Sequence, residues 1–271
     1  MPLDINESFI GRPTLNRIVS QTCTATQFKE DHYLRLAKEI RQEPRFHRKQ
    51  WEYIYILRAL EQFGLLSPNK TGLGFGCGKE PLAVVMAKFG LNVTVSDIPP
   101  LDTSDSHWGS KAAMDLFYGG ICSEEQYMKH VKFRAVNMNE IPNDLGKHDF
   151  VWSCCALEHL GSLKAGMEFI IDSTKCLKPG GVAIHTTELN MSSDDETFES
   201  PGLSLYRRRD LLDLQNRLVE MGCSVLPMNF YSGDQPEDKY IDLPPFKQEI
   251  HLKLLIEKFA ITSFGLVLRK T

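Results

Sequence analysis

The sequence contains no long apolar run, no paired-cysteine motif and no segment that resembles a secretion signal. Its longest apolar runs fall far short of the roughly 20 residues that a membrane-spanning helix requires. Residues 1–13 show no basic stretch followed by an apolar one, as a signal peptide would. The seven cysteines have neither CxxC spacing nor a regular repeat, so they predict reduced thiols rather than a disulfide framework or a zinc site. We therefore expect a soluble, cytoplasmic protein with no membrane span.

The chain also lacks an excess of positive charge. Its 31 lysine and arginine residues are outnumbered by 35 aspartate and glutamate residues, which gives a net charge of −4. A chain of this balance is not attracted in bulk to nucleic acid or to an anionic membrane, although a small anionic substrate remains compatible with it. The 271 residues suit one α/β domain with additions, and they contain no internal repeat or low-complexity tract.

The pattern of apolar residues changes near residue 70. Before this point, apolar residues recur with the helical spacing i, i+3, i+4 and i+7, as in Tyr53, Ile56, Leu57 and Leu60. Residues 1–69 are therefore interpreted as an N-terminal helical cap. After it, residues 70–271 alternate between helices and short apolar strands. We predict a first strand that ends at Phe75 and further strands at 91–97, 131–137, 149–155, 182–188, 224–230 and 259–270, the last one paired antiparallel at the edge of the sheet. Such alternation indicates a doubly wound, Rossmann-like α/β fold with a seven-stranded, mostly parallel sheet and helices on both faces.

Three glycines alternate with other residues in the stretch TGLGFGCGKE at 71–80, and a helix is predicted to follow. A phosphate-binding P-loop would need Ser or Thr after Lys79, where the chain has Glu80. A dinucleotide fingerprint would need a third glycine at residue 79 or 81, and the Glu80 carboxylate would repel a pyrophosphate. The loop therefore predicts a cofactor with less negative charge, bound at the carboxyl ends of the strands.

This loop, followed by Asp97 at a strand end, resembles the cofactor site of class I S-adenosylmethionine-dependent methyltransferases. Two later stretches, DFVWSCCALEHL at 149–160 and KCLKPGGVAIHTTE at 175–188, are similar to the fourth and fifth strands of that family, in the expected order. The resemblance covers about residues 72–188. It implies S-adenosylmethionine as the cofactor, with contacts from Gly74, Gly76, Cys77, Gly78, Glu80, Asp97, Ile98, Trp108, Asn137, Met138 and Cys154.

The resemblance also implies roles for these residues. Bare backbone in the glycine loop would let the methionine part of the cofactor approach. Asp97 would accept hydrogen bonds from both ribose hydroxyls, which suits a carboxylate. Ile98 would lie against the adenine face, while Asn137, in place of the family's usual aspartate, and Met138 would contact the adenine edge. Trp108 is open to two interpretations, stacking on the adenine or packing in the core.

Two positions in the glycine loop depart from the family pattern. Gly74 stands where an acidic residue is common, and Glu80 stands where a glycine is common. One interpretation is that Glu80 supplies the missing carboxylate for the methionine amino group from the other side of the loop. The other is that its charge only favours the N-terminus of the following helix. The adjacent Cys154 and Cys155 are interpreted as small residues that pack beside the cofactor, because a vicinal disulfide is strained.

The candidate catalytic residues follow the fourth and fifth predicted strands. Methyl transfer to a hydroxyl needs orientation and either a base or a metal that lowers the pKa of the hydroxyl. We predict His159 as the general base, with Glu158 orienting it or contacting the cofactor. His185 and Glu188 end the fifth strand on opposite faces and are further candidates, although a structural role for such a histidine is equally open. A second hypothesis is a divalent Mg²⁺ or Mn²⁺ ion held by some of His185, Glu188 and His251.

The wider pattern, including HTTELN at 185–190 and YRRRD at 206–210, looks like that of bacterial methyltransferases associated with surface-glycan synthesis. We therefore predict methylation of a hydroxyl of a sugar or glycan. Arginines 207–209 at a helix start suggest an anionic acceptor or, alternatively, a solvated basic turn. Residues 47–52, HRKQWE, are interpreted as a lid over the cofactor or a packed cap. The alternative functions are methylation of a small-molecule or lipid hydroxyl and a non-catalytic module that only binds S-adenosylmethionine; nucleic acid is not expected as a substrate.

Overall fold

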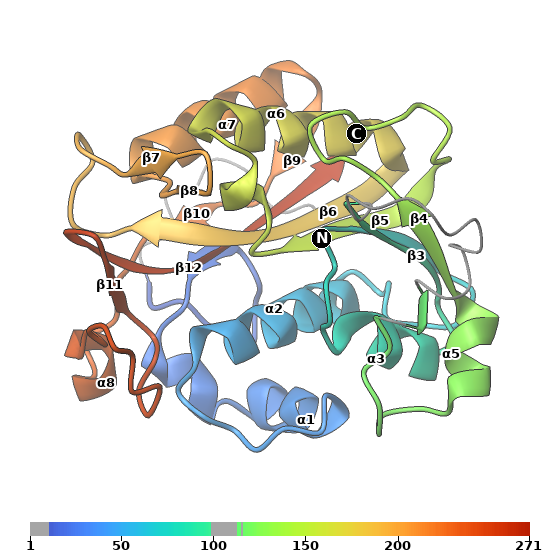
Figure 1. Ribbon diagram of the computed structural model, residues 1–271, viewed down its shortest axis with the longest axis horizontal. Helices are drawn as coiled ribbons and strands as arrows, with labels where there is room; N and C mark the ends of the chain where they lie inside the picture. The colour runs from blue at the N-terminus through green and yellow to red at the C-terminus, as the bar shows by residue number, and fades with distance from the viewer. Residues whose placement is uncertain (1–10, 99–112, 115) are drawn as a thin grey trace.

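One sheet carries the fold of the computed structural model, which describes residues 11–98, 113–114 and 116–271 (Figure 1). Ten strands of the described residues belong to it, in the order β10-β1-β12-β6-β5-β2-β3-β4, with the short strands β9 and β11 paired to β12. Neighbouring strands from β4 to β6 are parallel, and β12 is antiparallel to β6. The predicted Rossmann-like α/β class and the antiparallel direction of the last strand are thereby confirmed. The expected edge position is wrong, because β12 lies between β6 and β1.

The elements have the following bounds. The strands of the sheet are β1 (Ser20–Thr22), β2 (Thr71–Phe75), β3 (Asn92–Asp97), β4 (Val131–Ala135), β5 (His148–Cys154), β6 (Leu177–Asn190), β9 (Cys223–Val225), β10 (Met228–Asn229), β11 (Leu254–Ile256) and β12 (Phe259–Lys270), while β7 (Glu199–Ser200) and β8 (Leu203–Ser204) form a separate hairpin. The α-helices are α1 (Asp31–Glu39), α2 (Arg48–Gln62), α3 (Leu82–Lys88), α5 (Glu124–His130), α6 (Leu163–Ser173), α7 (Arg208–Glu220) and α8 (Pro236–Lys239). Short 3₁₀ helices are η1 (Ala25–Lys29), η2 (Leu157–His159) and η3 (Thr174–Cys176).

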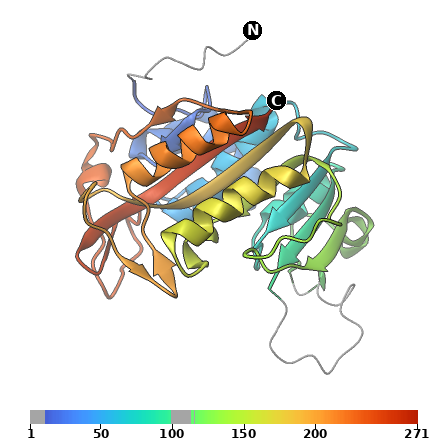
Figure 2. The same ribbon diagram turned by 90° about the horizontal axis from the view of Figure 1, so that it is seen from above.

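Helices cover both faces of the sheet, which explains why its central strands β2, β5 and β6 are largely buried. α1, α2, α3 and α5 lie on one face, and α6 and α7 run along the other (Figures 1 and 2). On the first face Trp51 of α2 belongs to the same buried cluster as Trp152 of β5. On the second face Phe169 of α6 and Leu214 of α7 pack with Phe264 of β12. No helix in the described part of the chain has both the length and the apolar character that crossing a membrane requires.

The structure departs from the predicted elements in two places. Residues 20–22, inside the segment expected to be helical, form β1 between β12 and β10. The strand expected at 224–230 is interrupted at Pro227, which has no N–H group to donate, and becomes β9 and β10. The carbonyl of Pro227 instead accepts from the N–H of Ser20 over 3.0 Å. The division into a cap of residues 1–69 and a core of residues 70–271 stays a prediction.

Candidate active site

The glycine loop joins β2 to α3 and is tied to the end of β3. Gly76 and Gly78 have φ angles of +58° and +48°, a left-handed backbone that favours glycine. A Cβ atom at Gly76 would lie 2.8 Å from Cβ of Ala156, so close packing also excludes a side chain there. The N–H group of Gly78 donates to Oδ2 of Asp97 over 2.9 Å. The loop and Asp97 are therefore held together as one unit.

A cavity of about 330 Å³ opens beside this unit, at the carboxyl ends of the parallel strands. It brings together six of the predicted site residues, namely Gly76, Asp97, Ile98, Asn137, Met138 and His159. Cys155, which was expected to pack beside the cofactor, also lines it. Its other lining residues were not predicted as part of the site, although each follows a parallel strand closely: Val136, Asn139, Ala156 and Leu160. The remaining predicted cofactor residues that the structure describes do not line it; these are Gly74, Cys77, Gly78, Glu80 and Cys154. Trp108 lies outside the described residues.

Asp97 and Asn137 keep hydrogen-bonding capacity toward the cavity. Oδ1 of Asp97 accepts from the N–H of Ile98 over 2.8 Å, so that each carboxylate oxygen has one described donor. An ionised carboxylate offers about four acceptor positions, which leaves room for two hydroxyl groups. Oδ1 of Asn137 accepts from the N–H of Asn139 over 3.0 Å, and its amide N–H groups have no partner among the described residues. Ile98 is 67% exposed at the cavity.

Gly74, Trp152 and Glu80 form a packed group behind the glycine loop. A Cβ atom at Gly74 would lie 2.3 Å from Cζ2 of Trp152, so the indole occupies the space of a side chain at position 74. Nε1 of Trp152 donates to Oε1 of Glu80 over 3.2 Å. Burial raises the pKa of Glu80 to about 8, although Lys49 and the indole hydrogen bond act in the opposite direction. The two departures from the family pattern, at Gly74 and Glu80, are thus linked through Trp152. Its indole occupies the space beside Gly74 and donates a hydrogen bond to the carboxyl group of Glu80.

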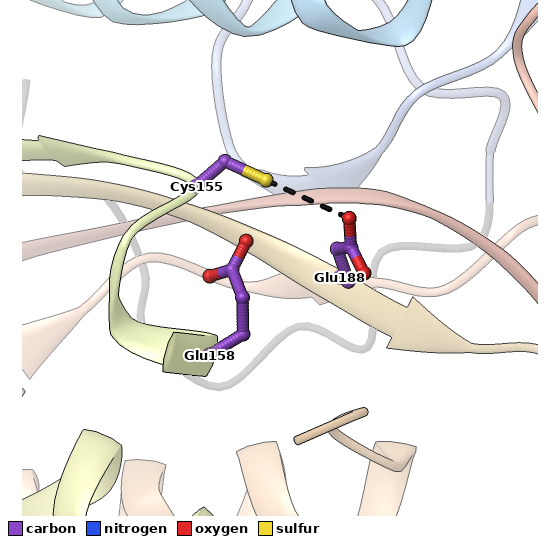
Figure 3. A group of neighbouring side chains, drawn as sticks. All are labelled: Cys155, Glu158 and Glu188. Atoms are coloured by element: carbon purple, nitrogen blue, oxygen red, sulfur yellow. Dashed lines mark hydrogen bonds between the residues drawn. The ribbon is translucent and has the colours of Figure 1, made fainter. Parts of the chain in front are cut away.

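Cys155, Glu158 and Glu188 converge at the ends of β5 and β6 (Figure 3). Sγ of Cys155 lies 3.9 Å from Oε1 of Glu188. Glu158 is fully buried, and its Oε2 accepts from the hydroxyl of Thr187 over 3.1 Å. Oε1 of Glu158 and Oε2 of Glu188 have no partner among the described residues. Burial and the charge of Glu188 raise the pKa of Glu158 to about 7, so this group can gain or lose a proton near neutral pH.

A buried ion network from the first turns of α2 packs against this cluster. Arg48 donates to Oε1 of Glu52 over 3.1 Å and also to Glu188. Lys49 donates to Oε2 of Glu52 over 3.1 Å and to the carbonyl of Cys154 over 3.0 Å. Burial acts to raise the pKa of Glu52, but Lys49 and Arg48 outweigh it and hold this pKa below its usual range. In the structure this part of the HRKQWE stretch is therefore a packed cap on the strand ends.

His159 lines the cavity and is held by the turn of the β7–β8 hairpin. Its Nδ1 lies 2.7 Å from the carbonyl oxygen of Gly202. Because a carbonyl only accepts hydrogen bonds, Nδ1 is the donor of this pair, and Nε2 is the ring nitrogen left to contact a group in the cavity. Orientation of His159 thus comes from Gly202, whereas the described hydrogen bond of Glu158 is to Thr187. The arrangement suits removal of a proton from a group in the cavity.

His185 and His251 do not join the carboxyl cluster, which corrects the metal hypothesis. His185 is buried, hydrogen-bonded to two serine hydroxyls at 2.8 and 3.3 Å, and burial lowers its pKa to about 3. Nδ1 of His251 pairs with Asp242 at 2.7 Å. The expected alternation along β6 is present: His185 bonds to α6, while Glu188 bonds to α2. The predicted metal-ligand set of His185, Glu188 and His251 is therefore wrong, and His185 is a neutral histidine of the core.

Comparisons with known proteins identify the family. Residues 45–233, more than half of the chain, match the family model of the methyltransferase domain, and the chain belongs to this family. A proposed sarcosine dimethylglycine methyltransferase from Galdieria sulphuraria is similar in structure, with a TM-score of 0.51 and 16% identity over 82% of this chain and 85% of that one. This likeness shows the shared fold.

Two further structures are similar at lower TM-scores. Magnesium protoporphyrin IX methyltransferase from Synechocystis PCC 6803 gives a TM-score of 0.48 and 14% identity over 92% of this chain and 96% of that one. The 1,6-didemethyltoxoflavin-N1-methyltransferase from Burkholderia thailandensis gives 0.49 and 13% identity over 83% and 79%. No curated protein sequence matches the chain.

Proposed function

We propose that this methyltransferase uses S-adenosylmethionine and methylates a hydroxyl group of a sugar or glycan. The observation that carries the proposal is the cavity in which Asp97, Asn137 and His159 meet beside the glycine loop. When bound, S-adenosylmethionine supplies a methyl group activated by its sulfonium. A cofactor of this kind carries less negative charge than a dinucleotide, which agrees with the Glu80 carboxyl group behind the loop.

The described residues fit this cofactor. The free acceptor positions of Asp97 suit the two hydroxyls of a ribose. Asn137 and Met138, which follow β4 and line the same cavity as Gly76, are assigned to the adenine edge. We assign Glu80 to the amino group of the methionine part, because a cation near this buried carboxyl group would favour its ionised form and offset the cost of burial. The packing of Trp152 against Gly74 holds Glu80 for this role.

The acceptor is assigned to the side of the cavity where His159 and the carboxyl cluster lie. Nε2 of His159 takes the proton of the acceptor hydroxyl, which makes its oxygen a better nucleophile. Cys155 of this cluster lines the cavity, and Glu158 and Glu188 are buried beside it, each with one carboxylate oxygen that has no partner among the described residues. Buried polar atoms without partners are costly, so hydroxyl groups of an acceptor that reached these two oxygens would be stabilised there. This chemistry favours a sugar over an acceptor with one isolated hydroxyl.

Methyl transfer to a mixture of monosaccharides and oligosaccharides tests the proposal. S-adenosylmethionine with a labelled methyl group is the donor, and mass spectrometry identifies O-methylated products. His159→Ala should lower kcat about 10²–10⁴-fold, because a positioned base contributes that much, while S-adenosylhomocysteine affinity stays unchanged. His130→Ala on α5 is the control and should keep full turnover. Transfer to nitrogen, or turnover that survives His159→Ala, would contradict the proposal.

A further inference from the structure

A second cavity, of about 390 Å³, lies at the carboxyl end of β6. Its walls are residues 189–194, which continue β6, together with Arg208 at the start of α7 and with Phe230 and Ser232 after β10. Figure 1 shows the β7–β8 hairpin beside this end of β6. The volume lies in the range of small-molecule sites, and none of these residues lines the cofactor cavity.

One connecting segment, residues 191–207, contacts residues of both cavities. Residues 191–194 line the second cavity, and the carbonyl of Gly202 holds the ring of His159, which lines the first. Near the end of the segment, the N–H of Tyr206 donates to the carbonyl of Glu188 over 3.0 Å. An acceptor long enough to extend from His159 along this segment would place a further unit at the second cavity.

Arg208 is the arginine of the YRRRD stretch that remains available to a ligand. Arg207 and Arg209 both pair with aspartate side chains. The guanidinium of Arg208 has no hydrogen bond or ion pair among the residues that the structure describes, and it lies 5.4 Å from the ring centroid of Phe230. Phe230 is itself stacked on Phe264, with ring centroids 5.0 Å apart, so the platform under Arg208 is fixed.

The cavity also offers acceptors and hydroxyl donors. Oδ1 of Asp194 accepts from the backbone N–H of Arg209 over 2.8 Å, and Oδ2 has no donor among the described residues. The hydroxyl oxygens of Ser192 and Ser193 accept backbone N–H groups, which leaves their O–H groups free to donate. The residues that line this cavity thus include one cation, Arg208, one carboxylate, Asp194, and several hydroxyl groups. The positive and negative charges are equal in number.

We propose that this cavity binds a glycosyl unit of the acceptor, with Arg208 and Asp194 as the paired hydrogen-bonding groups. Each sugar hydroxyl donates and accepts at once, and neighbouring hydroxyls match the paired atoms of a carboxylate or a guanidinium. A phosphate would be attracted by Arg208 but repelled by Asp194. The statement that the bound sugar is part of the methyl acceptor rests on the proposed function. Binding of a sugar in this cavity can be measured without methyl transfer.

Saturation-transfer NMR on the full chain tests the inference. The probes are glucose, galactose, mannose, rhamnose, N-acetylglucosamine and their disaccharides, and inorganic phosphate is followed by its ³¹P line width. We expect saturation of at least one sugar. In Arg208→Gln or Asp194→Asn its Kd should rise roughly tenfold, the usual loss for a charged hydrogen bond. Arg209→Gln is the matched control: it removes the same charge one residue along, outside the cavity lining, and should leave Kd unchanged.

Ser232→Trp provides a second variant that fills the cavity and keeps Arg208 and Asp194. It should abolish saturation of the sugar while circular dichroism shows an unchanged fold. No saturation of any probe, saturation that survives Ser232→Trp, or phosphate binding through Arg208 without sugar binding would overturn the inference. Calorimetry with S-adenosylhomocysteine separates the two proposals: sugar binding without cofactor binding refutes only the proposed function, and the reverse refutes only this cavity.

Discussion

Two neighbouring regions at the carboxyl ends of the strands use their polar groups in opposite ways. In the ion network, Arg48 and Lys49 both bond to the fully buried Glu52, so the charged groups satisfy one another. In the cofactor cavity, Asp97 and Asn137 make short local hydrogen bonds and retain free positions. Polar groups whose partners lie within the protein stabilise the fold, whereas polar groups with free hydrogen-bonding positions are available to a ligand. Changes in the network should therefore alter stability, and changes in the cavity should alter binding.

The largest effect is expected in the network. Glu52→Gln removes the fully buried charge between Arg48 and Lys49, which among the described residues leaves Arg48 paired with Glu188 alone and Lys49 with only the carbonyl of Cys154. We expect the free energy of unfolding, measured by urea denaturation, to fall by about 3–5 kcal/mol. Glu61→Gln is the control, because Glu61 also lies between two arginines, Arg35 and Arg58, but its side chain is 33% exposed. This variant should cost less than about 1 kcal/mol. Equal costs for the two variants would mean that the network does not stabilise the fold.

A smaller effect is expected behind the glycine loop. Gly74→Ala places a methyl group against Trp152, and overpacking of this kind costs about 1–3 kcal/mol. Trp152→Leu removes the clash with the indole, although Sγ of Cys77 also lies 2.4 Å from the added Cβ atom. The double variant should therefore lose less stability than the sum of the two single variants. Additive losses in denaturation experiments would show that the indole does not fill position 74.

The smallest effect, taken per pH unit, is the pH dependence of stability. The pKa of Glu80 rises from its ordinary value of 4.5 to about 8, so the folded protein holds this proton more tightly than the unfolded chain. The free energy of unfolding should therefore fall as pH rises through this interval, by at most roughly 1.4 kcal/mol per pH unit. Glu80→Gln should remove this contribution. His185 has the opposite sign and acts only below its ordinary pKa of 6.5, so the two proteins are best compared between pH 6.5 and 8, where parallel curves would contradict the assignment.

The fold and the cavity at Asp97 could be predicted where neighbouring residues in the sequence carry the pattern. The glycine loop, Asp97 and Asn137 each follow a strand, and parallel strands bring their carboxyl ends to one edge. The bond between Arg48 and Glu188 joins positions 140 residues apart, and no local pattern encodes it. His185 shows a second limit of prediction from sequence. Its position near the end of a strand suggested a catalytic role, but its side chain lies on the face of β6 that packs against α6, where it is structural.

The short elements were missed for a related reason. β1 has three residues and exists because the backbone of β12 and β10 is available on either side of it. Its own sequence carries no strand period of useful length. The break at Pro227, in contrast, has a local cause in the missing N–H group and could have been predicted.

Calorimetric titration with S-adenosylhomocysteine tests the central claim, that the cavity at Asp97 binds the cofactor. We expect about micromolar affinity for S-adenosylhomocysteine and no binding of NAD⁺. Asp97→Ala should raise Kd about 100-fold, because two hydrogen bonds to a charged group are lost. Asp144→Ala, which removes an exposed aspartate paired with Arg134, should leave Kd unchanged. Absence of binding, equal binding of NAD⁺, or an unchanged Kd in Asp97→Ala would contradict the account.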